Sequence, residues 1–134
     1  MPLPLPSATL LRRVLLLDAI ASAATAALVI AGADLLREPL GLPVPLLRGA
    51  GLVLVPFVAF VVLAAVREAI PVGAVRAVIV CNALWALASL AVLGLGLVMP
   101  TKLGAAFIVG QALAVAVLGG LQHVALGRLR TASA

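Results

Sequence analysis

The sequence predicts an all-α membrane protein with four transmembrane helices. Of its 134 residues, 66% are hydrophobic and 10% are charged, and the mean hydropathy is +1.37. Soluble domains carry about 25% charged residues, so this chain has too little charge to cover a water-facing surface. Four apolar stretches approach the roughly 20 residues that a helix needs to cross a bilayer. The sequence lacks the alternating segments of a transmembrane β-barrel.

We expect one domain, residues 1–134, with helices at about 11–34, 49–68, 74–98 and 101–128. Asp18, in the first helix, is the one charged residue inside the apolar stretches. Pro56, in the second helix, should kink that helix or free a backbone carbonyl. The connection between these two helices contains three prolines, and its leucines predict that it lies in the membrane interface.

The second connection is centred on Pro71 and Gly73, and Pro100 separates the third helix from the fourth. Thr101 follows that proline and is a candidate N-cap of the last helix. Met1–Pro6 alternates proline with leucine and is expected to be irregular.

The basic residues predict the orientation of the four helices. With four crossings, both termini and the second connection share one side of the membrane. That side carries six basic residues: Arg12, Arg13, Arg67, Arg76, Arg128 and Arg130. The other side carries three: Arg37, Arg48 and Lys102. The positive-inside rule therefore predicts that both termini are cytoplasmic in a bacterial inner membrane.

The first and third helices align at an offset of 64 residues, and their polar residues then coincide. This alignment pairs Arg12 with Arg76, Asp18 with Asn82, Thr25 with Ser89 and Gly32 with Gly96. The second and fourth helices align at an offset of 54, which pairs Pro56 with Gly110. We interpret this pattern as a tandem duplication of a helical hairpin. The alternative is coincidence in a sequence dominated by alanine, leucine and valine.

Polar residues gather at a similar depth in the predicted helices. At 1.5 Å per residue, Asp18 lies about 8 Å beyond Arg13, and Asn82 about 9 Å beyond Arg76. His123 lies about 8 Å before Arg128, with Gln122 beside it. Since Arg67 and Glu68 end the second helix on the same side, we expect all four helices to contribute to one polar layer. Polar groups at such depth face the bundle interior or a water-filled cavity.

This layer predicts a ligand or ion site. The candidate residues of this site are Asp18, Asn82 and His123, together with Trp85 near mid-membrane and Gln111 deeper, toward the other face. In the functional interpretation, Asp18 binds a cation or proton. In the structural one, Asp18 forms an ion pair with Arg67 or Arg76, or accepts a hydrogen bond from Asn82 that joins the helices. The candidate structural contacts are Arg67, Arg76, Ser22, Ser89 and Gln122.

Several function classes are disfavoured by the sequence. It has no nucleophile–base pair, paired carboxylates or glycine-rich phosphate loop, so we expect neither an enzyme nor a bound cofactor. His123 is the one histidine and has no cysteine or histidine cluster around it, so no metal site is expected. The basic residues are scattered, which argues against nucleic-acid binding. Cys81 is the one cysteine and has no partner for an intramolecular disulfide.

The segments Leu47–Phe57 and Asn82–Trp85 resemble uncharacterised small four-helix bacterial membrane proteins. This resemblance implies the fold and brings no activity. The chain is also similar in length to the small multidrug exporters, which place an acid in their first helix as Asp18 is placed here. It departs from them in using aspartate, in lacking tyrosine and in its long first connection, so their function is not carried over.

Three functions are consistent with the sequence. The first is a homo-oligomeric transporter or channel for a cation, proton or small solute. The second is a non-catalytic accessory or scaffold subunit of a larger membrane complex. The third is a binder of lipid or another hydrophobic molecule, which would use the region of Pro56 and Trp85 as a groove.

Overall fold

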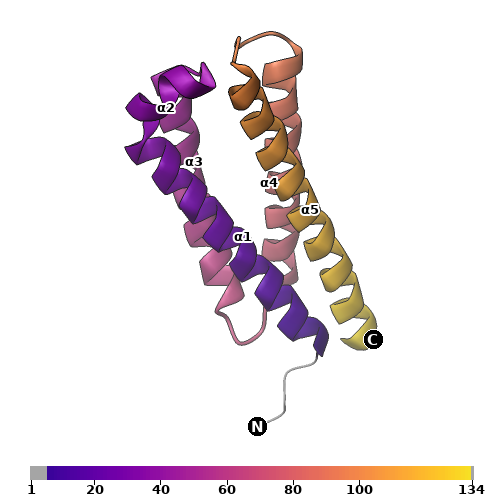
Figure 1. Cartoon of the computed structure of the whole chain (residues 1–134). Coiled ribbons are helices and arrows are strands. Elements are labelled where there is room, and N and C mark those ends of the chain that lie inside the picture. Colours follow the sequence, from indigo (N-terminus) through magenta and orange to yellow (C-terminus); the bar gives the residue numbers. More distant parts are fainter. Residues whose placement is uncertain (1–5, 134) are drawn as a thin grey trace.

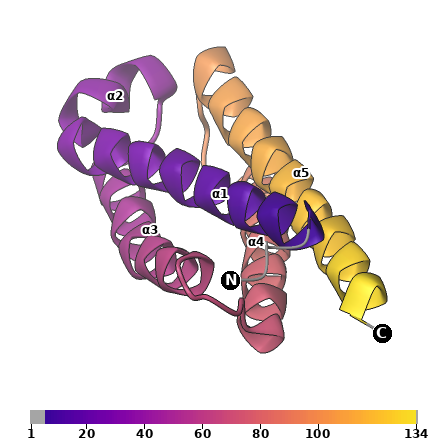
Figure 2. The ribbon, with the colours of Figure 1, turned by 90° about the horizontal axis from the view of Figure 1, so that it is seen from below.

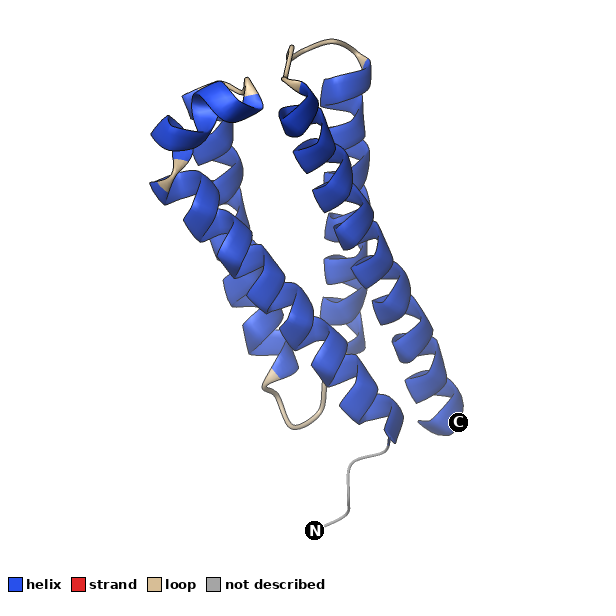
Figure 3. Cartoon of the chain, viewed as in Figure 1, coloured by secondary structure: helices blue, strands red, loops and turns tan. Residues whose placement is uncertain are grey.

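The computed structural model describes residues 6–133, which form five α-helices and no strands (Figures 1 and 3). The helices are α1 (Pro6–Ala31), α2 (Ala33–Leu40), α3 (Val44–Ala65), α4 (Val72–Gly94) and α5 (Lys102–Ser133). All except α2 are long and apolar enough to span a membrane. Of the irregular segment expected at the N-terminus, Met1–Leu5 lies outside the described residues, and Pro6 is the first residue of α1.

The first connection contains the short helix α2. Gly32 separates α2 from α1, and Gly41 ends α2 in the left-handed conformation, with φ of 63°. Glycine adopts this conformation without steric cost. Pro39 lies near the C-terminus of α2, and Pro43 is the N-cap of α3. Ala33 and Leu40 are buried while the charged residues of α2 face outward, so this helix covers one end of the bundle.

The long helices form two hairpins, α1 with α3 and α4 with α5. In addition, α1 packs along α5, whereas α3 and α4 have few contacts with each other (Figure 2). The hairpins lie close together near the start of α1 and diverge toward α2 (Figure 1). One apolar cluster fills each end of the bundle: the first contains Leu11, Leu15, Val61 and Val75, and the second contains Val29, Leu40, Leu47 and Ile108. The two hairpins are therefore joined mainly between α1 and α5, and the side between α3 and α4 is the more open one.

Hydrogen bonds between the end of α2 and the start of α5 join the hairpins at the divergent end. The backbone N–H of Thr101 donates to the Leu40 carbonyl at 3.1 Å, and the Thr101 hydroxyl donates to the Pro39 carbonyl at 2.6 Å. The same hydroxyl accepts a hydrogen bond from the Gly104 N–H at 3.0 Å, which confirms the predicted cap. A Cβ atom at Gly104 would collide with the Leu40 carbonyl oxygen, so glycine is required for this close approach.

Arg12 connects α1 to the C-terminal end of α3 at the opposite end of the bundle. Its Nε donates to the Ala65 carbonyl and its Nη2 to the Arg67 carbonyl, each at 2.7 Å, and Nη2 also donates to the Glu68 carbonyl at 3.2 Å. These carbonyls lie at or just beyond the last turn of α3, where a cation also interacts favourably with the helix dipole.

Replacing Gly104 with alanine should destabilise the protein by about 1–3 kcal/mol, the typical cost of overpacking a close contact. Gly120→Ala is the matched control on the same helix, because a Cβ at Gly120 meets nothing within 4 Å. Unfolding in mixed micelles with increasing SDS measures both variants. Equal stability of the two would contradict the close approach of α5 to α2.

Candidate functional site

A buried hydrogen-bonded cluster joins α1, α4 and α5. It contains Asp18 and Ser22 of α1, Asn82 of α4 and Gln122 of α5, and no member is more than 6% exposed. Asn82 Nδ2 donates to Asp18 Oδ2 at 2.8 Å and to Gln122 Oε1 at 3.0 Å. Gln122 Nε2 donates to Asp18 Oδ2 at 2.7 Å, and the Ser22 hydroxyl donates to Asp18 Oδ1 at 3.2 Å. We call these four residues the polar cluster.

The Asp18 carboxyl group is satisfied entirely by uncharged donors. It accepts three hydrogen bonds, from two amides and one hydroxyl, and it is 0% exposed. The single salt bridge within residues 6–133 joins Arg48 to Asp34 at the surface, at 2.7 Å. Burying a carboxyl group without such donors would be costly, so the cluster imposes a strong constraint on how the three helices meet.

The expected ion pair of Asp18 with Arg67 or Arg76 is not formed. The side chains of both arginines are exposed at the end of the bundle, and Asp18 has the Asn82 hydrogen bond instead. Nor do all four long helices contribute to the polar layer, since α3 supplies no residue to the cluster. Arg67 lies beyond the last residue of α3, in the connection to α4, and its side chain is exposed.

His123 does not line the site, contrary to our expectation. Its side chain is exposed, whereas that of Gln122 is buried against Asp18 and Asn82. Adjacent residues of an α-helix point about 100° apart, so only one of the two can face the cluster. The depth estimated from the distance along the sequence to Arg128 placed both residues in the same layer. That estimate does not distinguish an inward side chain from an outward one.

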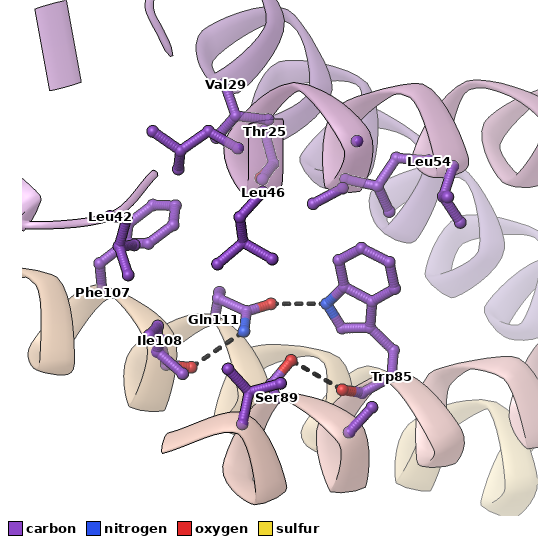
Figure 4. Close-up of a pocket in the computed structure, with 16 residues that line it drawn as sticks. Thr25, Val29, Leu42, Leu46, Leu54, Trp85, Ser89, Phe107, Ile108 and Gln111 are labelled. Atoms are coloured by element: carbon purple, nitrogen blue, oxygen red, sulfur yellow. Dashed lines mark hydrogen bonds between the residues drawn. The ribbon is translucent and has the colours of Figure 1, made fainter. Parts of the chain in front are cut away.

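Trp85 and Gln111 form a second polar contact, nearer to α2. Trp85 Nε1 donates to Gln111 Oε1 at 2.7 Å, and Gln111 Nε2 donates to the Ile108 carbonyl at 2.9 Å (Figure 4). The Ser89 hydroxyl donates to the Trp85 carbonyl of its own helix at 2.7 Å. These three side chains are half-buried. The predicted site is therefore divided: Asp18 and Asn82 lie in the polar cluster, while Trp85 and Gln111 form a separate pair.

Two neighbouring cavities lie between the hairpins on the open side of the bundle. One has a volume of about 280 Å³ and is drawn in Figure 4. The other has a volume of about 630 Å³ and extends to Ser22 and Asn82 of the polar cluster. Both are lined mainly by apolar side chains, and they share Val53, Leu54, Trp85 and Ala88. We call the two together the α3–α4 groove.

Pro56 and Trp85, the two residues of the hypothesised hydrophobic groove, both line the larger cavity. Sequence reasoning did not identify the remaining walls, such as Val53, Leu54 and Ala88. An apolar residue that lines a groove has the same composition as one that faces lipid, so the sequence carries no signal that separates the two.

No protein-family model matches the chain, and no significant similarity was found to curated proteins or to solved structures. The site is therefore interpreted from its own geometry.

The polar cluster should couple Asn82 and Gln122 energetically. We expect a double-mutant cycle with Asn82→Ala and Gln122→Ala to give a coupling free energy of about 0.6 kcal/mol, and at most about 1.7 kcal/mol, as for other interhelical hydrogen bonds in membranes. SDS-induced unfolding of the single and double variants measures this value. Additive effects would show that the hydrogen bond between the two amides contributes nothing to stability.

Proposed function

We propose that this protein is a non-catalytic integral membrane protein that binds a hydrophobic molecule from the bilayer in the α3–α4 groove. The observation that carries this proposal is the pair of adjoining apolar cavities between two hairpins that are in close contact elsewhere. Ligand sites in proteins are mostly apolar, have volumes of about 300–1,000 Å³ and contain a few polar groups that orient the ligand. The groove combines these properties.

The connectivity of the bundle supports access from the lipid. The polar cluster joins α1, α4 and α5, whereas α3 packs mainly on α1. Consequently α3 forms one wall of the groove without a polar contact to α4 among the described residues. Several groove residues, including Val53, Phe60, Leu84 and Ala88, are exposed on the surface of the chain. A molecule dissolved in the bilayer can therefore enter sideways, without crossing a polar barrier.

Transport of a cation or proton at Asp18 has weaker support. Both carboxylate oxygens already accept hydrogen bonds, and the side chain does not line either cavity of the groove. A solute that binds Asp18 would have to reach a carboxyl group that Ser22, Asn82 and Gln122 already surround.

Proton or cation flux that is lost with Asp18→Asn would favour that function. A stoichiometric heteromeric partner that copurifies in mild detergent would favour the accessory-subunit alternative.

We further propose an inner-membrane location with both termini cytoplasmic. The start of α1, the connection between α3 and α4 and the end of α5 lie at the same end of the bundle (Figure 1). Together with the start of α4, which contains Arg76, these segments carry six of the nine basic residues. The positive-inside rule assigns such an end to the cytoplasm.

Duplication of a hairpin is also a proposal, and the meeting of Asp18 with Asn82 supports it. These residues are equivalent under the offset of 64, and their side chains are hydrogen-bonded at 2.8 Å. In a duplicated bundle, the pair α3 and α4 would correspond to the pair α5 and α1. The second pair is closely packed and the first is open, so the groove would be the site at which the bundle departs from its internal symmetry.

Single-cysteine labelling tests the orientation. In a Cys81→Ala background, a cysteine introduced by Ser133→Cys should resist a membrane-impermeant maleimide in intact cells and react after lysis. Met99→Cys, in the connection before α5, should react in intact cells. The reverse pattern would overturn the proposed orientation.

Trp85 is the one tryptophan of the chain, and tyrosine is absent, so its fluorescence reports on the groove directly. With the protein in nanodiscs, bromododecane should quench Trp85 saturably if it occupies the groove. Ala88→Phe places a ring between the two cavities and should weaken this binding about tenfold or more. Ala83→Phe is the control, since Ala83 is exposed on α4 and does not line the groove. Linear quenching that is identical in all three proteins would refute the binding site.

A further inference from the structure

One polar side-chain atom of the polar cluster is left without a hydrogen bond: the amide oxygen of Asn82. Within residues 6–133, Asn82 donates two hydrogen bonds through Nδ2, and Oδ1 accepts none. Asn82 is only 2% exposed. Among the described residues, no fully buried side-chain nitrogen or oxygen atom lacks a hydrogen-bond partner, so Oδ1 must keep some accessible surface. Asn82 lines the larger cavity of the groove. The larger cavity is therefore the open space that Asn82 adjoins.

The orientation of the Asn82 amide is determined by its neighbours. Asp18 Oδ2 and Gln122 Oε1 are both acceptors, and they lie 2.8 Å and 3.0 Å from the Asn82 amide group. If the amide were turned over, its oxygen would face two acceptors and neither contact would be a hydrogen bond. The NH₂ group must face the cluster, so the oxygen points away from Asp18 and Gln122 and is left to accept a hydrogen bond from a ligand in the adjoining cavity.

Resting on the proposed function of the groove, we propose that its ligand is a long-chain molecule with a hydroxyl headgroup, which donates a hydrogen bond to Asn82 Oδ1. An unsatisfied carbonyl in an apolar environment favours a ligand that brings a donor. The surrounding wall is largely apolar, so the ligand must be hydrophobic apart from that group. Long-chain and isoprenoid alcohols have this chemistry.

A neutral donor fits this position better than a cationic one. The negative group nearest to the groove is Asp18, whose oxygens are occupied by Ser22, Asn82 and Gln122. An ammonium group would therefore meet the uncharged oxygen of Asn82 and gain no direct contact with the carboxylate. Moving a charge into the hydrocarbon region is costly, whereas a hydroxyl needs only a single acceptor.

The groove also indicates where the chain of the ligand would lie. Asn82 and Ser22 line the larger cavity alone, whereas Trp85 and Leu54 line both cavities. Asn82 is the eleventh of the 23 residues of α4, so the headgroup would lie near the middle of this helix. From there the hydrocarbon chain would run past Trp85 toward Leu42 and Phe107, near the α2 end of the bundle (Figure 4).

A matched pair of ligands tests the headgroup without changing the protein. ω-Bromododecanol and ω-bromododecyl methyl ether differ in one donor hydrogen, and both quench Trp85 through the bromine. We expect the alcohol to bind wild-type protein about threefold to tenfold more tightly than the ether, the contribution of one hydrogen bond. Asn82→Leu should remove this preference. Ala83→Leu, on the exposed face of α4 and outside both cavities, should retain it.

The outcomes separate this proposal from the proposed function. Saturable binding of both ligands with equal affinity would overturn the hydroxyl headgroup and leave the hydrophobic groove intact. Tighter binding of ω-bromododecylammonium than of the alcohol would overturn the neutral class. Saturable binding of none of the compounds would refute both proposals. The ligand comparison in wild-type protein decides the question even if Asn82→Leu does not fold.

Discussion

The carboxyl group of Asp18 lies in the apolar interior of the bundle, where hydrogen-bond donors must come from the chain itself. Amides from α4 and α5 and the hydroxyl one turn along α1 supply them. Because a buried carboxyl group without donors is so costly, this requirement determines which faces of the three helices meet. It also sets their rotation, since Asn82 and Gln122 must both point at the same oxygen.

This constraint acts on three of the four long helices and leaves the fourth free of it. α3 is attached to α1 by apolar packing and by the hydrogen bonds of Arg12 at its C-terminal end. It has no comparable attachment to α4, and the groove lies between these two helices. The polar cluster and the groove are therefore parts of one arrangement. The same Asn82 that donates to Asp18 through its amide nitrogen also lines the larger cavity of the groove.

The two ends of the bundle are joined by different means. At the end near the termini, Arg12 binds carbonyls at and beyond the last turn of α3. At the other end, α2 accepts hydrogen bonds from Thr101, and its backbone approaches α5 closely at Gly104, which has no side chain. The Arg12 contact joins α1 to the end of α3, and the Thr101 contact joins α2 to the start of α5. Neither contact holds α3 against α4. The two cavities of the groove lie between these two ends.

The sequence by itself determined the helical class, the four long apolar helices and the residues that needed partners in the interior. Hydrophobic length and the rarity of charge are local properties, and Asp18 and Asn82 were conspicuous because polar residues are rare there. Only the tertiary structure decided which partners they found. The rotation of each helix placed Gln122 inside and His123 outside, and it left Arg67 and Arg76 too far toward the surface to pair with Asp18. The tertiary structure also determined the groove. Apolar residues such as Leu54 and Ala88 can face lipid, a neighbouring helix or a ligand equally well. Only the spacing of α3 and α4 distinguishes these environments.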